Sequence, residues 1–279
     1  MVQAESGAQA GSGGRTLRVA IIGSGPTGFY VAAPLLKQDD LDVSIDMFDR
    51  LPTPFGLVRG GVAPDHLKTK SVVKAYDKTA RDPRFRFYGN VELGQDIDVA
   101  GLRRHYHAIF YCTGAQTDRR MRIPGEQLGG SHTATEFVAW YNGHPDFRDL
   151  EFDLSTTDVV VVGVGNVAVD VARILCRTDD ELLETDIAEH ARDVLRESRV
   201  ERVHMLGRRG VAQAAFTNTE IKELGEMADA APVVREAEVT LDELSEAAIA
   251  DDRVASKKVE IVQSYVGFER GEIYFNFVI

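Results

Sequence analysis

Two glycine-rich turns in this sequence have a spacing suited to binding the pyrophosphate of a dinucleotide. One reads GSGPTG at residues 23–28 and the other GVGNVA at 163–168, and each follows a short apolar run that predicts a buried strand. In such a turn the first glycine permits the bend, the second lets a phosphate approach the backbone, and the third position, glycine or alanine, lets helix and strand pack closely. The start of the following helix then directs its amides and its dipole at the phosphates. One such turn can occur by chance, but two in one chain predict two dinucleotide sites.

The residues that end the next strand differ between the two halves of the chain. Asp49 closes the strand predicted at 42–48, about 20 residues beyond the first turn, where a carboxylate can accept hydrogen bonds from ribose hydroxyls. Arg208 and Arg209 follow the strand predicted at 202–206, where two guanidinium groups can bind a 2′-phosphate. The alternative for the arginine pair is a solvated surface turn. We therefore predict FAD or NAD at the first site, NADP at the second, and hydride transfer from a nicotinamide to a flavin.

The order of apolar strands and helical segments predicts an α/β fold with doubly wound parallel sheets. We expect two Rossmann-like dinucleotide-binding domains, the first at 16–117 and the second at 118–279. In the first half we predict short strands at 85–88 and after the turn that begins at 89, a helix at 102–106, and a strand from 108 that ends in a turn at 113–115. In the second half we predict helices at 131–142 and 216–227, a helical insertion at 179–199, an acidic helical stretch at 237–252, and strands at 258–262 and 273–279.

The segment 51–66 carries three prolines and three glycines, which prevent a regular element, yet it is too apolar for a solvated loop. A long apolar loop beside a nucleotide site is commonly a wall of the ligand site, and a packed connector is the alternative. A helix is predicted from Leu67 onward. Its basic side chains form either a solvated face or a docking patch for an acidic partner; they are Lys68, Lys70, Lys74, Lys78 and Arg81.

The composition excludes several classes of protein. With 279 residues and 44% hydrophobic content the chain can bury a sizeable core, and no apolar run reaches the roughly 18 residues of a membrane span. A net charge of −12 argues against nucleic-acid binding. Cys112 and Cys176 form no C-x-x-C pair, which excludes a metal knuckle and a redox-active disulfide, so we expect reduced thiols and a cytoplasmic protein. Residues 1–15 predict a disordered leader without a signal peptide.

Four segments together closely resemble the adrenodoxin reductase-type ferredoxin–NADP reductases, including bacterial members. They are PTPFGLVRGGVAPDH at 52–66, the Thr-Gly-Ala turn at 113–115, GVGNVAVDVARIL at 163–175 and GRRGVAQAAF at 207–216. The resemblance implies an FAD-binding domain interrupted by an NADP-binding domain. It also implies that NADPH gives a hydride to FAD and that the flavin passes single electrons to a ferredoxin, an acidic iron–sulfur protein.

Carried over position by position, the resemblance implies a set of site residues and no metal ligand. For FAD they are Thr27, Asp49, Leu57 and Leu93, which add to the glycines Gly23, Gly25 and Gly28 predicted from the turn itself. For NADP they are Arg119, Val164, Gly165, Asn166, Val167, Arg208, Arg209 and Glu220. His66 and Glu223 are implied as a catalytic polar pair near the flavin–nicotinamide junction. A histidine there could route the proton that flavin reduction takes up, or it could only shape the loop and orient the nicotinamide.

The chain departs from the family by apolar changes in loops, at Phe55, Leu67, Val211 and Ala212. The family continues past the equivalent of residue 279 and returns to its FAD domain, so we expect the C-terminal part of that domain to be missing and the flavin pocket to be incomplete. A nucleotide-binding fragment without activity is therefore an open alternative. A pyridine nucleotide–disulfide reductase would need a cysteine pair beside the flavin, and an iron–sulfur subunit would need cysteine-rich motifs. The sequence has neither.

Overall fold

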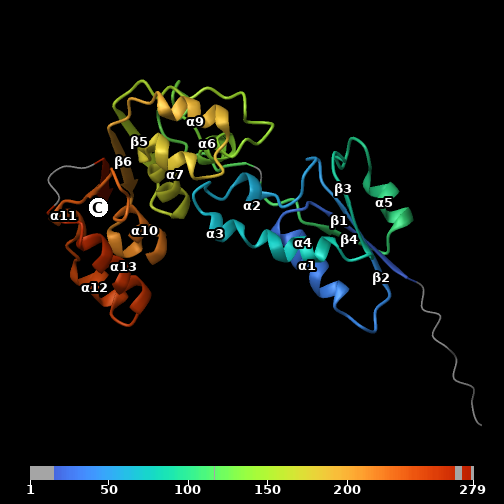
Figure 1. The fold of residues 1–279 in the computed structure, drawn as a ribbon. Helices are drawn as coiled ribbons and strands as arrows, with labels where there is room; N and C mark the ends of the chain where they lie inside the picture. Colours follow the sequence, from blue (N-terminus) through green and yellow to red (C-terminus); the bar gives the residue numbers. More distant parts are fainter. Residues whose placement is uncertain (1–15, 116, 268–271, 278–279) are drawn as a thin grey trace, which may run out of the picture. The chain divides into compact units, whose positions relative to one another are not determined.

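A computed structural model describes residues 16–115, 117–267 and 272–277, so the predicted leader at 1–15 lies outside the described residues (Figure 1). The chain divides into two compact units. The first comprises residues 1–59 and 70–116, and the second comprises residues 60–69 and 117–279. Each unit contains a four-stranded sheet, and all the strand pairs in both sheets are parallel, as the predicted α/β fold requires. The division of the chain into an FAD-binding and an NADP-binding domain stays a prediction.

The first unit is built on a sheet in which the apolar strand after the leader is central. Its strands are β1 (Leu17–Ile22), β2 (Val43–Phe48), β3 (Phe85–Tyr88) and β4 (Ala108–Tyr111), in the order β3-β2-β1-β4. Its helices are α1 (Pro26–Leu36), α4 (Val73–Ala80), α5 (Val99–His105) and the single turn α2 (Leu57–Gly60). β1 is apolar at all but one position and is buried from Val19 to Ile22, which is typical of a strand covered on both faces. On one face Phe29 of α1 stacks on Tyr76 of α4, with ring centroids 4.7 Å apart.

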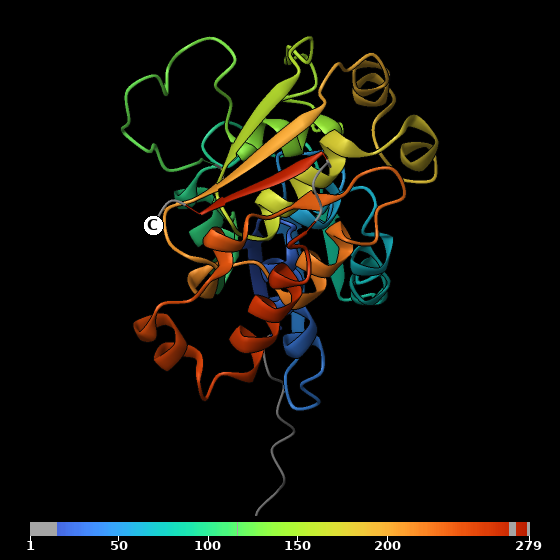
Figure 2. The same ribbon diagram turned by 90° about the vertical axis from the view of Figure 1, so that its left-hand side faces the viewer.

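The second unit repeats the strand–turn–helix pattern. Its strands are β5 (Asp158–Val162), β6 (Arg202–Gly207), β7 (Pro232–Val233) and β8 (Ile273–Phe277), in the order β5-β6-β8-β7. Figure 2 shows β5, β6 and β8 running side by side. Its helices are α3 (Leu67–Lys70), α6 (Ala134–Tyr141), α7 (Asn166–Cys176), α8 (Asp179–Leu183), α9 (Glu189–Arg196), a 3-10 turn (Val211–Gln213), α10 (Asn218–Leu224), α11 (Glu236–Val239), α12 (Glu243–Ile249) and α13 (Arg253–Gln263).

The core of the second unit lies between its sheet and the helices α6, α7, α10 and α13. Trp140 and Tyr141 of α6 and Ile174 of α7 are among its fully buried side chains. α6 begins with a reciprocal capping box in which Thr133 and Glu136 satisfy each other's backbone amides. By contrast, Val160 and Val162 on the edge strand β5 are more than half exposed.

Three elements differ from the sequence prediction. The stretch 258–262, predicted as a strand from its alternating pattern, lies inside helix α13. Asp252 caps that helix by accepting hydrogen bonds from two backbone amides, and Ala255, Val259 and Val262 form its buried stripe. No strand forms between the turn at 89 and helix α5, where only an isolated bridge joins Leu93 and Ile97. The helix predicted from Leu67 is broken into α3 and α4.

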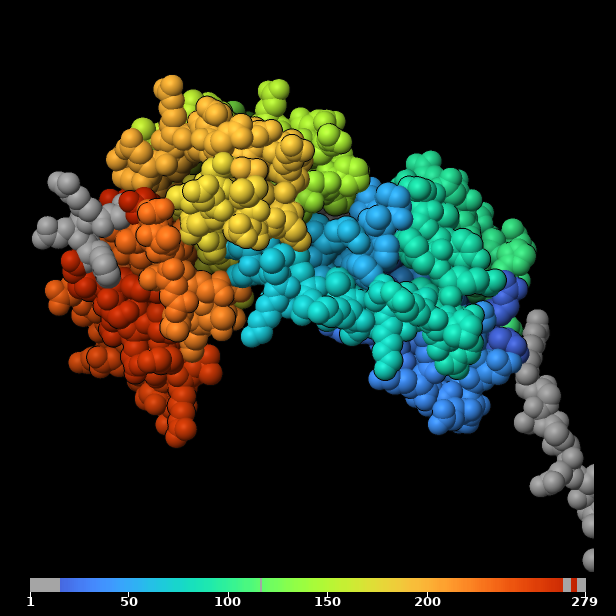
Figure 3. All heavy atoms as spheres, in the orientation of Figure 1, coloured from blue at the N-terminus to red at the C-terminus, as the bar shows by residue number. Residues whose placement is uncertain are grey.

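The acidic stretch predicted at 237–252 is helical in two pieces, α11 and α12. α12 buries none of its residues and forms part of the red surface in Figure 3, which agrees with a solvated face. Within the described residues, no helix is both long and apolar enough to span a bilayer.

Candidate functional site

The first glycine turn is closely packed against the end of β4. Gly23 has a φ of +100°, and a Cβ on it would lie 2.4 Å from the carbonyl oxygen of Cys112. A Cβ on Gly28 would lie 2.4 Å from the carbonyl oxygen of Gly23, so both positions admit only glycine. α1 begins after Gly25 with no side chain capping its amides. The start of this helix therefore keeps amides available for an anion.

Asp49 points at this turn from the end of β2. Its Oδ2 accepts hydrogen bonds from the backbone N–H and the hydroxyl of Ser24, at 2.8 and 2.6 Å, and its Oδ1 accepts one from the N–H of Leu51 at 2.9 Å. An ionised carboxylate offers about four acceptor positions, so one remains on Oδ1 for another donor. Asp49 thus lies where a ribose-binding acid is expected. Of the other predicted FAD contacts, Thr27 and Leu57 are exposed and Leu93 is half-buried.

The second glycine turn is more open. Gly163 is bent like Gly23, with a φ of +152°, but a Cβ on Gly165 would meet nothing within 4 Å. α7 begins after Gly165, again without a side-chain cap. Because β5 and β6 are parallel, the turn after β5 and the arginine pair after β6 lie at the same edge of the sheet. Arg208 and Arg209 are both exposed, and neither forms an ion pair with the described part of the chain.

The backbone just before α10 is bonded to this second turn. The side-chain oxygen of Asn166 accepts a hydrogen bond from the N–H of Thr217 at 2.7 Å. The carbonyl of Val164 accepts from the N–H groups of Ala215 and Phe216 at 2.8 and 3.0 Å. Two of the four turn residues predicted to contact NADP therefore also hold the start of the helix that carries Glu220 and Glu223. Of the other predicted NADP contacts, Val167 and Arg119 are exposed.

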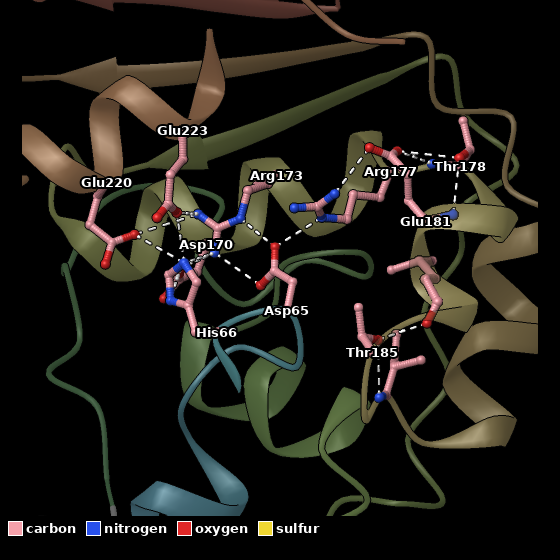
Figure 4. A network of polar contacts seen from close by, with 12 residues as sticks. Asp65, His66, Asp170, Arg173, Arg177, Thr178, Glu181, Thr185, Glu220 and Glu223 are labelled. Atoms are coloured by element: carbon pink, nitrogen blue, oxygen red, sulfur yellow. Dashed lines mark hydrogen bonds and ion pairs between the residues drawn. The ribbon is translucent and has the colours of Figure 1, made fainter. Parts of the chain in front are cut away.

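The structure brings the predicted pair of His66 and Glu223 together (Figure 4). His66 Nε2 lies 2.7 Å from Glu223 Oε2 and 3.6 Å from Glu220 Oε2, although the two glutamates come from α10 and the histidine from residues 60–69. His66 is largely buried, with 14% of its side chain exposed. The contact itself is a structural fact, whereas the catalytic role of the pair stays a prediction.

Three residues that the sequence reasoning missed complete this cluster. They are Arg173 and Asp170 of α7 and Asp65, which precedes His66 in the chain. Arg173 is 1% exposed at its side chain and forms a two-pronged ion pair with Asp65, at 2.6 Å from Nε to Oδ2 and 3.1 Å from Nη2 to Oδ1. The sequence held a signal, because Arg173 lies one helical turn after the buried Val169, on the apolar stripe of α7. A charged residue on such a stripe indicates a buried ion pair.

Burial and charge act in opposite directions on the carboxyl groups of the cluster. Burial raises the pKa of Asp170 and also that of Glu220, where the nearby Asp170 adds to the effect. Burial alone would also raise the pKa of Asp65, but the hydrogen bond and positive charge of Arg173, with Arg177 nearby, bring the pKa of Asp65 below its ordinary value. The strongest ion pair in the cluster is therefore the one between Asp65 and Arg173.

Ligand atoms of His66, Asp170 and Glu220 all lie within 4.8 Å of one another, a spacing that could suit a metal ion. However, Arg173 Nη2 lies 2.7 Å from Asp170 Oδ1, so a guanidinium already supplies the positive charge that these carboxylates need. We assign no metal ion to this group.

The model of the pyridine nucleotide-disulphide oxidoreductase family matches residues 17–254 of this chain. The chain belongs to this family. The match spans both glycine turns and the arginine pair. The family's name refers to disulphide reductases, yet the two cysteines of this chain are free and separate, so the redox pair of those enzymes is not present in the sequence.

Relatives within this family confirm the narrower resemblance to adrenodoxin reductase-type enzymes. NADPH-ferredoxin reductase FprA of Mycobacterium tuberculosis is 48% identical over 260 residues, which are 91% of this chain and 57% of that protein. Mitochondrial NADPH:adrenodoxin oxidoreductase of Arabidopsis thaliana is 51% identical over 211 residues, which are 75% of this chain and 44% of that protein. The structure of M. tuberculosis FprA in complex with NADPH matches with a TM-score of 0.90 and 46% identity, covering 94% of this chain and 59% of that one. The chain thus spans less than two thirds of the length of these relatives.

Proposed function

We propose that this family member is a ferredoxin–NADP(+) reductase, a flavoprotein in which NADPH gives a hydride to FAD and electrons then pass singly to a ferredoxin. One observation supports this most strongly. Each glycine turn lies beside the end of a neighbouring strand, and that end carries a carboxylate at the first turn and two guanidinium groups at the second. The relatives named above act with NADPH on ferredoxin or adrenodoxin, which agrees with the same assignment.

The residues of the first turn fit FAD. Gly25 and the uncapped start of α1 leave the backbone open to a pyrophosphate, and Asp49 keeps one acceptor position for a ribose hydroxyl. When bound, FAD supplies a hydride acceptor that can release its electrons one at a time. In this proposal Thr27, Leu57 and Leu93 line the same site.

The residues of the second turn fit NADPH. Gly165 and the uncapped start of α7 leave room for the pyrophosphate. Arg208 and Arg209, which form no ion pair within the described residues, can bind the 2′-phosphate in a two-pronged way. Arg119, Val164, Asn166 and Val167 are proposed as further contacts, and Glu220 as a contact on the nicotinamide side.

His66 and Glu223 are proposed as the polar pair that serves the reaction. A hydride needs no general base, but flavin reduction takes up a proton, and a histidine hydrogen-bonded to a carboxylate can hold and pass one. The Nε2–Oε2 distance of 2.7 Å is that of a hydrogen bond, which supports this role.

The partner in this proposal is an acidic iron–sulfur protein of the ferredoxin type. Helix α4 of the first unit exposes Lys74 and Lys78, whereas Arg81 is paired with Asp77 on the same helix. In a chain of net charge −12, exposed lysines of this kind suit an acidic surface. We also propose a cytoplasmic location, in agreement with the free thiols of Cys112 and Cys176.

The experiment is a visible spectrum of the purified chain after mixing with FAD and removing the excess. We expect any flavin that the chain retains to be bleached by NADPH far faster than by NADH. Tight NADPH binding without any bound flavin would instead support a nucleotide-binding fragment. Equal bleaching by both nucleotides would contradict the role of the arginine pair.

A further inference from the structure

One loop of the second unit gathers three arginines without an acidic partner. It spans residues 117–130, which are green in Figure 2, and we call it the arginine loop. Arg119, Arg120 and Arg122 are all exposed, and none of them forms an ion pair with a residue that the structure describes. Elsewhere in this unit Arg202 is paired with Asp158 at 2.6 Å. The guanidinium groups of the loop, by contrast, are available to another molecule.

The acids of the same loop are engaged with other donors. Glu126 Oε1 accepts a hydrogen bond from the N–H of Met121, and its Oε2 accepts one from the N–H of Arg122, both at 2.8 Å. Asp118 Oδ1 accepts a hydrogen bond from the hydroxyl of Thr135, also at 2.8 Å. These carboxylates therefore stabilise the loop instead of pairing with its guanidinium groups.

The bonds to Glu126 also fix the shape of the loop. Arg122 has a φ of +58°, in the left-handed region that residues other than glycine adopt uncommonly. Its N–H is bonded to the Glu126 carboxylate, and the N–H of Glu126 is bonded in turn to the carbonyl of Ile123 at 3.3 Å. A segment held in this way has less conformational freedom to lose on binding, so the loop is shaped in advance for a partner.

Apolar side chains lie among the arginines. Met121 and Ile123 are 48% and 47% exposed, and Leu128 is 66% exposed. Arginine and methionine are both enriched in protein–protein interfaces, whereas a phosphate group has no apolar surface to cover such side chains. This mixture of charged and apolar surface therefore indicates a protein partner and not a nucleotide.

The charge of the loop indicates what kind of protein. It carries three arginines against two acids, in a chain of net charge −12. An acidic protein is repelled by the chain as a whole and attracted only where positive groups are concentrated. The loop is such a place in the second unit.

We propose that the arginine loop is a docking surface for the acidic iron–sulfur partner. Arg120 and Arg122 make its charged contacts, Met121 and Ile123 make its apolar contacts, and Glu126 holds the backbone that presents them. The inference rests on the proposed function for the nature of the partner. It adds a surface of the second unit to the exposed lysines of α4.

The test measures binding of the whole chain to an immobilised acidic ferredoxin of the 2Fe–2S type, by biolayer interferometry. The main variant combines Arg120→Gln with Arg122→Gln and keeps Arg119. At low ionic strength we expect its affinity to fall about five- to tenfold, because two ion pairs at the interface are lost. At about 0.5 M salt, which screens surface charges, the difference from the unmodified chain should largely disappear. Circular dichroism and NADPH titration should show an unchanged fold and an unchanged nucleotide affinity.

The matched control combines Arg103→Gln with Arg104→Gln on α5. It changes the charge by the same amount at another exposed pair, and it should alter the affinity for ferredoxin by less than about twofold.

Two further variants separate the contributions of the loop. Met121→Ser with Ile123→Ser should weaken binding at low and at high salt, because apolar contacts are not screened. Glu126→Gln makes the chain less negative, which by charge alone would strengthen binding to an acidic protein. We expect it to weaken binding, since it removes one of the two bonds that hold the loop backbone.

The proposal is overturned if the Arg120 and Arg122 variant binds ferredoxin as well as the unmodified chain does, or if the α5 control loses as much affinity. Loss of NADPH affinity in the loop variant would overturn it too, by assigning these arginines to the nucleotide. Binding to phosphatidylglycerol vesicles that is lost in this variant, while ferredoxin binding is kept, would indicate a membrane surface instead.

Failure of this inference and failure of the proposed function give different results. An unmodified chain that binds no ferredoxin contradicts the proposed partner and the docking surface together. Ferredoxin binding that depends only on Lys74 and Lys78 of α4 contradicts the docking surface alone. The spectral assay with FAD and NADPH uses no ferredoxin, so its outcome is independent of both.

Discussion

The two glycine turns are nearly the same in sequence and differ in what surrounds them. The first is packed so tightly that a methyl group on Gly23 would collide with backbone, and its acid, Asp49, is bonded to the turn itself. The second leaves open space at Gly165, and its arginines, Arg208 and Arg209, make no ion pair with any described residue. A preorganised first site suits a cofactor that stays bound, and an open second site suits one that enters and leaves.

The helices that follow the turns differ in the same way. α1 and α7 each have 11 residues, but the buried residues of α1 are all apolar or glycine, whereas α7 buries Arg173 among its apolar side chains. Apolar packing therefore holds α1 in the first unit, whereas a buried network of charged side chains helps to hold α7 in the second. Each difference between the two units can be tested by a matched pair of changes.

The largest expected effect comes from the buried ion pair of the second unit. Asp65→Asn leaves Arg173 without its main partner and should lower the free energy of unfolding by about 3–5 kcal/mol. Because the pKa of Asp65 is lowered in the folded chain, its contribution is present above its ordinary pKa of 3.8 and is lost as the pH falls through the lower folded value.

Hydrogen exchange resolved by unit, at pH 7 and below pH 3.8, measures this effect. In the unmodified chain we expect the amides of the second unit to lose protection from exchange when the pH is lowered. In the Asp65→Asn chain, which already lacks the ion pair, we expect a smaller loss of protection. Asp77→Asn is the control, since it breaks an exposed pair with Arg81 and should change stability by less than about 1 kcal/mol. If Asp65→Asn and Asp77→Asn lowered the stability by the same amount, the second unit would not depend on the buried ion pair of Asp65 and Arg173.

Next in size is the contrast between Gly23→Ala and Gly165→Ala. The first forces an alanine to a φ of +100° against the carbonyl of Cys112, which should cost about 3–4 kcal/mol of stability. The second adds a methyl group in open space, so stability should hold while nucleotide binding weakens. Urea unfolding followed by circular dichroism, with NADPH titration of the folded chains, separates the two. A stable Gly23→Ala chain would remove the packing difference between the turns.

The arginine pair should affect binding and not folding. Changing Arg208 and Arg209 to Ala should weaken NADPH binding by about 2–4 kcal/mol through lost charge-assisted hydrogen bonds, while NADH binding is spared. Arg103 and Arg104 of α5, an adjacent and exposed pair in the first unit, provide a control with the same change in charge. Calorimetric titration with each nucleotide measures both. The phosphate role is refuted if the two double variants lose NADPH affinity equally.

The smallest effect is expected from Asp49, the acid that is bonded to the first turn. Asp49→Ala removes an acceptor for ribose and frees the N–H groups of Ser24 and Leu51, so FAD binding should weaken by about 1–3 kcal/mol while NADPH binding is unchanged. Flavin fluorescence on titration gives the affinity, with the exposed Asp40→Ala as the control. An unaltered flavin affinity would remove Asp49 from the site.

The sequence predicted the parts of this fold in which local pattern and tertiary packing agree. β1 with its turn and α1, and β5 with its turn and α7, could each be placed because apolar runs, glycine spacing and helix starts all point the same way. The stretch 258–262 failed because an alternation of lysine or glutamate with valine and isoleucine fits two periods. The helix is stabilised by its N-terminal cap at Asp252, six residues before this stretch begins, and by packing of α13 against α10 and α11.

The candidate site was predictable only in part. His66 and Glu223 were placed together by family resemblance, since 157 positions separate them in the chain and no local pattern relates them. Arg173 and Asp170 were missed because the glycine motif assigns only the first turn of α7 to the nucleotide, and the rest of the helix was interpreted as packing. Asp65 was missed because its partner Arg173 lies 108 positions away in the chain. A charge on the buried stripe of a helix is the general signal that such a reading overlooks.

The hydrogen bond from Thr217 to Asn166 affects how any variant of the second turn is interpreted. Asn166 is at once a proposed phosphate neighbour and the anchor of the segment that leads to Glu220 and Glu223. In the proposed function, an Asn166→Ala variant would therefore change both nucleotide affinity and the position of Glu220 and Glu223, and its behaviour could not be ascribed to a lost ligand contact alone. Glycine positions in the turn, which hold no such anchor, give the cleaner measure of how strongly the nucleotide is held.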